Sequence, residues 1–231
     1  MTDKGLRGSK YQEIMEEFRS VMSGRGGWID SLIPPVAFII INAFVNFNIA
    51  LLVASAAAIL IVIYRLIKRQ SLRYAFGGVG GVLVAVMVAK LVGSAQGYFL
   101  PGIVTGSATA IICLISIIIK RPLVAWTSYI TRRWPLGWYW HPKVRPAYNE
   151  VTLAWGIFFA IRAILQFQLF LRGEAATLGI VQLILGWPVL ILLLISSYLY
   201  GLWRLQHLEG PSVKEFTEGV NPPWGGQKRG F

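Results

Sequence analysis

Long apolar runs, separated by short polar or basic segments, dominate the chain between about residues 31 and 203. Most of these runs hold the roughly 20 apolar residues that an α-helix needs to cross the hydrocarbon core of a bilayer. The pattern therefore predicts an all-α fold, a polytopic membrane helix bundle with six transmembrane helices. These spans are expected at residues 31–46, 49–67, 74–92, 98–119, 149–171 and 176–203.

The boundaries of the spans carry turn and capping signals. Pro34 and Pro35 fit the first turn of a helix that begins near Ser31, because the N–H groups of a first turn lack helical partners. The residues at 46–48 predict a tight turn, so the first two spans form a hairpin. Pro188 predicts a kink in the sixth span.

Both ends of the chain are expected to lie outside the bundle. Residues 1–30 form a cytoplasmic N-terminal segment, in which apolar residues at helical spacing predict an amphipathic helix at 9–22 lying on the membrane surface. Residues 204–231 are interpreted as a flexible cytoplasmic tail. No part of residues 1–30 is apolar for long enough to be the central region of a signal peptide.

Composition supports lipid as the solvent. Hydrophobic residues make up 55% of the chain and charged residues 14%, and the mean hydropathy is +0.60. The net charge of +12 does not predict a nucleic-acid partner, because the basic residues lie between apolar runs instead of forming one basic domain. Cys113 is the single cysteine and is expected to be a small core residue.

The distribution of basic residues predicts the orientation. Apart from Lys90, Arg162, Arg172 and Arg65, which lies near the 2–3 connection at the end of the second span, every Lys and Arg falls in the N-terminal segment, the 2–3 and 4–5 connections or the C-terminal tail. The opposite connections are short, which accounts for part of this imbalance. Translocating the two short basic loops would still be unfavourable, so both termini are expected inside, in a bacterial cytoplasmic membrane.

Residues 124–148 are interpreted as an interfacial segment of the transmembrane domain. Trp and Tyr alternate there with Arg and Lys, and three prolines argue against one continuous helix. Indoles at headgroup level and basic side chains on lipid phosphates would anchor the segment, and anionic membrane lipids are the expected partners. The expected headgroup contacts are Arg69, Arg73, Lys120, Arg121, Arg132 and Arg133.

Arg162 is the residue that most needs an explanation. It falls near the middle of the fifth span, where an arginine costs roughly 2.5–3.5 kcal/mol on insertion scales. Gln166 lies one turn away on the same helix face, while Asn42 and Gln182 fall at similar depths. We expect no Asp or Glu inside any of the six spans, and therefore no carboxylate partner for Arg162 at its own depth. The hypothesis is a ligand-binding cluster in which Arg162 and Gln166 hold a lipid phosphate or another anion; a structural polar contact is the alternative.

Glycines in the third and fourth spans, among them Gly102 and Gly106, are expected to let helix backbones approach closely. No phosphate-binding loop, nucleophile elbow, zinc helix or pair of intramembrane carboxylates is present in the sequence. We therefore predict no enzymatic activity, no cofactor and no metal. A proton-coupled carrier is disfavoured for the same lack of intramembrane acids.

Three segments carry a resemblance to a known family: Arg69-Gln70-Ser71-Leu72-Arg73-Tyr74-Ala75-Phe76-Gly77-Gly78, Tyr98-Phe99-Leu100-Pro101-Gly102 and Lys120-Arg121-Pro122-Leu123. They resemble the bacterial domain-of-unknown-function 3159 family over about residues 30–205. The resemblance extends to the Arg162 region and to Leu185-Gly186-Trp187-Pro188. It implies a bacterial membrane location and a shared fold, but no established reaction.

A more remote similarity links the basic residue and Pro-Leu after the fourth span to intracellular septation protein A, a multispan inner-membrane protein implicated in envelope synthesis. Two functions are weighed. The first is a non-enzymatic scaffold or accessory subunit of an envelope or bioenergetic membrane complex, with a membrane protein or a second copy as partner. The alternative is a small carrier or lipid- or anion-binding protein using the polar site around Arg162.

Overall fold

The computed structural model describes residues 27–68 and 72–231. Within them the regular structure is helical and contains no strand, so the all-helical prediction is confirmed. The chain divides into two units, Met1–Tyr98 and Phe99–Phe231, which are described separately. The amphipathic helix predicted at 9–22 and Arg69 lie outside the described residues.

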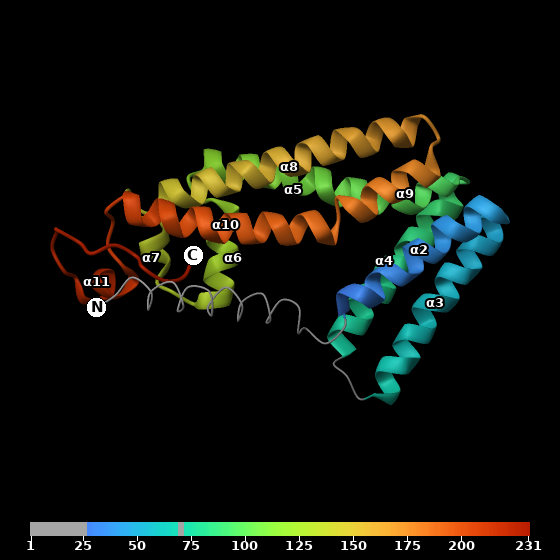
Figure 1. Cartoon of the computed structure of the whole chain (residues 1–231), viewed down its shortest axis with the longest axis horizontal. Coiled ribbons are helices and arrows are strands. Elements are labelled where there is room, and N and C mark those ends of the chain that lie inside the picture. The colour runs from blue at the N-terminus through green and yellow to red at the C-terminus, as the bar shows by residue number, and fades with distance from the viewer. Residues whose placement is uncertain (1–26, 69–71) are drawn as a thin grey trace, which may run out of the picture. The chain divides into compact units, whose positions relative to one another are not determined.

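Three packed helices make up the described part of the first unit: α2 (Gly27–Phe44), α3 (Phe47–Ile67) and α4 (Leu72–Val92) (Figure 1). Asn46 caps α3, because its side-chain oxygen accepts the N–H of Ile49 at 2.9 Å. α2 begins four residues earlier than predicted, so its two prolines lie beyond the first turn. The fixed φ of proline is helical, and the helix continues through them.

Small residues bring the helices of the first unit together. The buried side of α3 carries Ala50, Ala54 and Ala58 at one-turn spacing, each at most 1% exposed. Alanines spaced in this way allow close backbone approach in lipid, where packing and not water exclusion drives association. The buried ring of Phe38 stacks on Tyr98, with centroids 4.2 Å apart. The unit is therefore held by alanine packing along α3 and by one aromatic stack.

The second unit consists of seven helices, preceded by the short 3-10 helix η1 (Ala95–Phe99). They are α5 (Leu100–Ile118), α6 (Leu123–Arg132), α7 (Leu136–Tyr139), α8 (Arg145–Leu171), α9 (Ala175–Ile184), α10 (Trp187–His207) and α11 (Val213–Glu218). The most extensive helix contact in this unit joins α5 and α8. There, a side chain at Gly156 would lie 3.2 Å from the Cβ of Cys113, so glycine permits the close approach.

Four stretches of helix are long and apolar enough to cross a membrane. They are Phe47–Tyr64, Ala95–Ile118, Arg145–Leu171 and Ala175–His207. Among the described residues, α2 and α4 contain shorter apolar stretches, Ile33–Phe44 and Gly80–Val92. The chain is thus a multipass membrane protein by the length and composition of its helices.

The predicted sixth span is two helices and not one kinked helix. α9 ends at Ile184 and α10 starts at Trp187, so the break falls at Leu185 and Gly186 (Figure 1). A side chain at Gly186 would lie 2.7 Å from the carbonyl oxygen of Gln182. Pro188 lies in the first turn of α10, where its missing N–H removes no helical bond. Proline therefore starts the second helix after the break.

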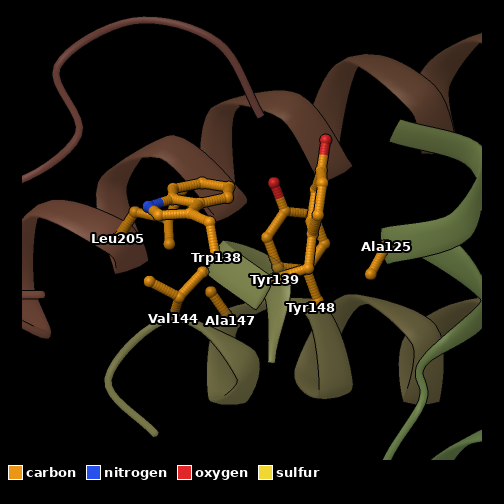
Figure 2. Close-up of a cluster of buried hydrophobic side chains, with 7 residues drawn as sticks. All are labelled: Ala125, Trp138, Tyr139, Val144, Ala147, Tyr148 and Leu205. Carbon is orange, nitrogen blue, oxygen red and sulfur yellow. The ribbon is translucent and has the colours of Figure 1, made fainter. Parts of the chain in front are cut away.

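Residues 124–148 supply much of a buried core, and their predicted position at the membrane interface stays a prediction. Its prolines do interrupt it: Pro135 precedes α7, and α6 ends at Arg132, after which the capping residue Arg133 has a φ of 58°. Trp138 and Tyr139 are fully buried, although indoles were expected at headgroup level. The aromatic cluster, shown in Figure 2, comprises Ala125, Trp138, Tyr139, Val144, Ala147, Tyr148 and Leu205.

Edge-to-face packing explains why these rings turn inward. Trp138 and Tyr139 meet with centroids 5.1 Å apart, and Tyr139 meets Tyr148 at 5.2 Å. Such pairs are favoured beyond their buried area. The Tyr139 hydroxyl lies 3.2 Å from Ser128 Oγ, which satisfies its polar end, and burial raises the pKa of Tyr139.

The C-terminal segment, for which the sequence predicts a flexible tail, folds onto this aromatic cluster. The indole N–H of Trp138 donates to the carbonyl oxygen of Pro211 at 2.8 Å. Phe231 stacks on Tyr148 with centroids 4.4 Å apart. Arg132 Nε donates to the carbonyl oxygen of Phe231 at 3.1 Å. These contacts join residues far apart in the sequence, and hydropathy along the chain does not reveal them.

Local hydrogen bonds also order the segment. Ser212 and Glu215 form a capping box at the start of α11. The other Glu215 oxygen, Oε1, accepts the N–H of Gly225 at 2.7 Å. The N–H groups of Gly225 and Ser212 lower the pKa of Glu215, because they stabilise the carboxylate. Residues 204–231 thus form a folded element with its own capping and loop contacts.

Adding one methyl group at Gly201 should release this segment. Gly201 is a buried residue of α10, and a Cβ there would overlap the Phe231 ring. Overpacking of this kind costs about 1–3 kcal/mol. We expect Gly201→Ala to speed tryptic cleavage at Lys228 in limited proteolysis. Gly106→Ala is the matched control, because a Cβ at Gly106 meets nothing within 4 Å. Equal cleavage of the two variants would contradict the packing described here.

Candidate functional site

Three helices of the second unit meet at a pair of glutamines. Gln166 of α8 is completely buried, and its Nε2 donates to Oε1 of Gln182, on α9, at 3.5 Å, the long limit of a hydrogen bond. On α5, a side chain at Gly102 would lie 2.8 Å from Nε2 of Gln182. The glycine therefore makes room for the Gln182 amide, and the pair links α8 to α9 beside α5.

Arg162 lies one turn before Gln166 on α8. It is half-buried, and its Nε atom is buried without a hydrogen-bond partner. The Oε1 atom of Gln166 is likewise buried and unpartnered. No ion pair joins Arg162 to an acid in the described part of the chain. Leaving such donors and acceptors unpaired costs about 1–3 kcal/mol each, so this level of the bundle carries unused hydrogen-bonding capacity.

The structure brings together part of the cluster predicted from the sequence. Gln166 and Gln182 are in contact, and Arg162 adjoins them along α8. Asn42 is a half-buried residue of α2 and belongs to the first unit, so it is not part of the site described here. We call Gly102, Arg162, Gln166 and Gln182 the interhelical polar site.

The residues predicted to contact lipid headgroups differ in what they touch. Lys120, Arg121 and Arg133 are exposed, and the guanidinium of Arg121 lies 4.4 Å from the ring centroid of Trp140. Arg132 instead turns inward to Phe231 and lies 5.2 Å from the Trp134 ring centroid. The side chain of Arg73 lies outside the described residues.

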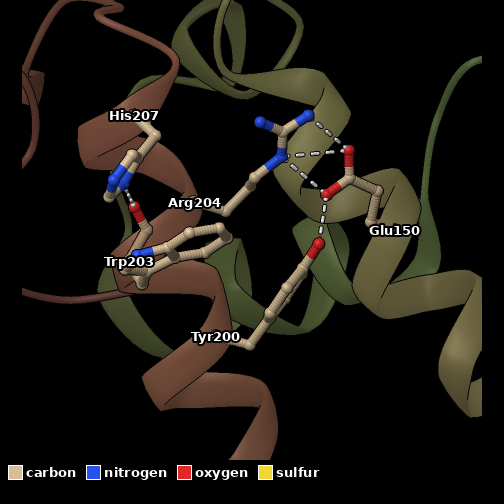
Figure 3. A network of polar contacts seen from close by, with 5 residues as sticks. All are labelled: Glu150, Tyr200, Trp203, Arg204 and His207. Carbon is tan, nitrogen blue, oxygen red and sulfur yellow. Dashed lines mark hydrogen bonds and ion pairs between the residues drawn. The ribbon is translucent and has the colours of Figure 1, made fainter.

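A polar network that the sequence analysis missed joins α8 to α10 (Figure 3). Arg204 holds the Glu150 carboxylate with two nitrogens: Nε lies 2.8 Å from Oε2, and Nη2 lies 2.9 Å from Oε1. The Tyr200 hydroxyl donates to Oε2 at 2.7 Å. Glu150 lies inside α8 and within the predicted fifth span, 149–171, so the expectation of no Asp or Glu inside the spans was wrong.

Further along the same pair of helices, the indole N–H of Trp155 donates to Ser197 Oγ at 2.8 Å. The two contacts pin α8 to α10 at two levels. A sequence signal for the first contact exists: Tyr200 and Arg204 share a helix face one turn apart, near the end of a span, and Glu150 lies near the start of the neighbouring one. Bidentate Arg–carboxylate pairs are also strongly directional.

The described ranges contain no cluster of residues suited to metal or redox chemistry. No group of three His, Cys, Asp or Glu residues comes together there. Cys113 is fully buried against α8. His141 packs on Trp224 with centroids 5.3 Å apart, and partial burial, followed by the charge of Lys143, lowers the pKa of His141. Among these residues, the interhelical polar site has the hydrogen-bonding groups that fit a ligand best.

Comparison with known proteins bears on identity. The family model described as "protein of unknown function (DUF3159)" matches residues 22–206, well over half of the chain. The chain belongs to this family. Neither a curated protein nor a solved structure matches the chain. The resemblance predicted from the sequence is thus confirmed for this family, and the more remote similarity to intracellular septation protein A stays a prediction.

Breaking the Glu150–Arg204 pair should loosen α8 from α10 in this family member. Each partner is about one-third exposed, so solvent screening limits the coupling energy to about 1 kcal/mol. We expect Glu150→Gln and Arg204→Gln to lower the free energy of unfolding in mixed micelles non-additively. The control is Glu218→Gln, because its pairing with Lys214 is exposed and 3.8 Å long. Additive effects in the double-mutant cycle would contradict the contact.

Proposed function

We propose that the chain is a six-span protein of a bacterial cytoplasmic membrane with both termini inside. We further propose that it acts as a non-enzymatic scaffold or accessory subunit of an envelope or bioenergetic membrane complex. The observation that carries the scaffold role is the folded assembly of α6, α7, α11 and the loop 219–231 on the aromatic cluster, which we call the platform. A rigid surface outside the membrane suits recognition of a partner.

The span count is supported by helix lengths. α2 and α4 are 18 and 21 residues long, so each approaches the roughly 20 residues that cross a bilayer. Counting α9 and α10 together as one span, the six segments alternate direction and leave the platform on the side of the basic connections. The orientation follows from the unfavourable translocation of short loops rich in Lys and Arg.

The chemistry of the platform favours an acidic or anionic partner. Its exposed basic residues include Arg133 and Lys214, and Lys120 and Arg121 are exposed at the end of α5. Complementary charge steers association and fixes orientation more than it adds affinity. A membrane-protein subunit with an acidic face and anionic lipids each fit this surface, whereas a second copy of the chain would have to bind through another face. The scaffold role requires a protein partner.

The topology is testable by cysteine labelling of intact bacteria. Cys113 is buried and is replaced by Ala, after which single cysteines are introduced at two exposed positions, Thr131 on the platform side and Glu174 in the α8–α9 turn. A membrane-impermeant maleimide should label Glu174→Cys in intact cells and Thr131→Cys only after permeabilisation. Labelling of Thr131→Cys in intact cells would overturn the orientation.

The scaffold role predicts a stoichiometric assembly. The protein purified with native lipids should run in native mass spectrometry as a complex of fixed composition. The double variant Arg133→Glu/Lys214→Glu should lose the partner, whereas Arg172→Glu, a charge reversal in the opposite connection, should keep it. A wild-type protein that emerges only as a monomer without bound protein would contradict the scaffold role.

A second candidate is a small carrier or a lipid- or anion-binding protein that uses the interhelical polar site. It is favoured by the unpartnered Arg162 Nε and Gln166 Oε1 atoms, because a cation within a membrane span needs a compensating partner. In this case the purified protein should retain an anion or an anionic lipid.

A further inference from the structure

The contacts of α5, α8 and α9 fix their relative register. Gln166 bonds to Gln182 across α8 and α9, and Gly102 of α5 lies against Gln182. Further along, Gly156 of α8 faces Cys113 of α5. Neighbouring antiparallel helices advance together by one turn every four residues. The residues one turn from the glutamine pair, on the side away from the α8–α9 turn, are therefore Gly106 on α5, Arg162 on α8 and Gly186 just after α9.

This is the level at which the sixth span is broken. The helix stops after Ile184 and restarts at Trp187, which interrupts its ladder of backbone hydrogen bonds inside a candidate membrane span. Irregular backbone at membrane depth is tolerated only where it is buried in protein or lines a polar cavity. By this register the break lies at the level of Arg162, whose Nε is buried and unpartnered, and the broken helix has polar backbone groups of its own to satisfy.

Space is available at the same level. Gly106 is buried, yet a Cβ built on it would meet nothing within 4 Å. One turn away, a Cβ on Gly102 would meet the Gln182 amide at 2.8 Å. The close packing at the glutamine pair therefore opens beside Gly106, on the face of α5 that packs against α8.

The charges at this level select an anion. Glu150 is the single acidic residue in the sequence of helices α3–α10, and it is paired with Arg204. α10 begins without a side-chain cap, so the positive end of its helix dipole adds to the charge of Arg162. Discontinuous membrane helices bind anionic groups at such half-helix N-termini. The buried Gln166 amide completes the set: its Oε1 is unpartnered while its Nε2 bonds to Gln182, and interchanging O and N by rotation of both amides turns an N–H donor toward the anion.

We propose that Arg162, Gln166 and the first turn of α10 bind an oxyanion, a phosphate or carboxylate group, at the break between α9 and α10. The inference deepens the second candidate function and rests on it. The guanidinium supplies paired donors to the oxyanion, and the anion neutralises the arginine inside the span. The group comes from a small free anion or from the headgroup of an anionic lipid.

Two binding assays on the full-length protein distinguish the sources. In phosphatidylcholine nanodiscs, inorganic phosphate is titrated and followed by calorimetry. In nanodiscs that also contain phosphatidylglycerol, the lipid retained after exchange is measured by native mass spectrometry. Phosphate binding in the first assay identifies a free anion as the ligand, and lipid retention in the second identifies the headgroup.

Arg162→Gln should weaken whichever binding is observed roughly tenfold to hundredfold, the loss expected for a hydrogen bond to a charged group. Arg162→Lys should keep part of it. Arg172→Gln, which changes an exposed arginine at the end of the same helix, should bind as the wild type does. Gly106→Val removes no polar group and fills the open space at Gly106, at the level of Arg162, so it should also weaken binding, and it serves if Arg162→Gln does not fold.

Three results would overturn the proposal. If the wild-type protein binds neither phosphate nor the anionic lipid, both the site and the second candidate function fail. If it binds one of them equally well with Arg162→Gln or Gly106→Val, the function stands but its site is elsewhere. If Arg162→Gln changes only stability, Arg162 neutralises the carbonyl end of α9 and has no ligand.

Discussion

Hydrocarbon offers no hydrogen-bond partner to a backbone amide, so the candidate membrane spans are almost entirely unbroken helix, in which each amide bonds within the helix. Where the backbone does depart from helix inside a candidate span, at Leu185 and Gly186, the neighbouring α8 carries the polar residues Arg162 and Gln166. The same constraint explains the glycines and alanines on α3, α5 and α8, because helix association in lipid relies on close packing. The break after α9 and the unpartnered polar atoms of α8 thus lie close to one level of the bundle.

Outside the apolar stretches, a different balance holds. The platform is built on aromatic rings that are buried because residues 204–231 fold back over them. Without this segment the rings would be partly exposed to water. Phe231, the Arg132 bond to its carbonyl and the Trp138 bond to Pro211 connect the end of the chain to the segment after α5. This arrangement gives a membrane bundle a rigid surface, which is the physical basis of the proposed scaffold role.

The sequence predicted the helices well where hydropathy alone decides them. The expected spans agree with α3, α5 and α8 to within a few residues, because each is a long apolar run bounded by polar residues. It failed where distant contacts decide the structure. Trp138 resembles an interfacial indole until α10 and the chain end cover it. The break at Gly186, by contrast, is set locally by the carbonyl oxygen of Gln182, four residues earlier, and the sequence predicted it only as a kink at Pro188.

The candidate site shows the same division. Spacing on α8 placed Arg162 with Gln166, and equal depth placed Gln182 beside them, because antiparallel helices joined by a short turn keep a common level. Depth alone does not distinguish Gln182 from Asn42 as a partner of Gln166. That choice depends on which helices pack together. Glu150 was missed because it lies in the first turn of the fifth span, ahead of the apolar residues on which the prediction of that span rests.

The most direct measurement is an experimental structure of the protein in native-lipid nanodiscs, with an antibody fragment bound to the platform. Our account predicts a break in the sixth span at residues 185–186, at the level of Arg162 on α8, with oxyanion density between the guanidinium and the start of α10. A continuous helix through residues 184–187, with Arg162 directed toward lipid, would contradict it.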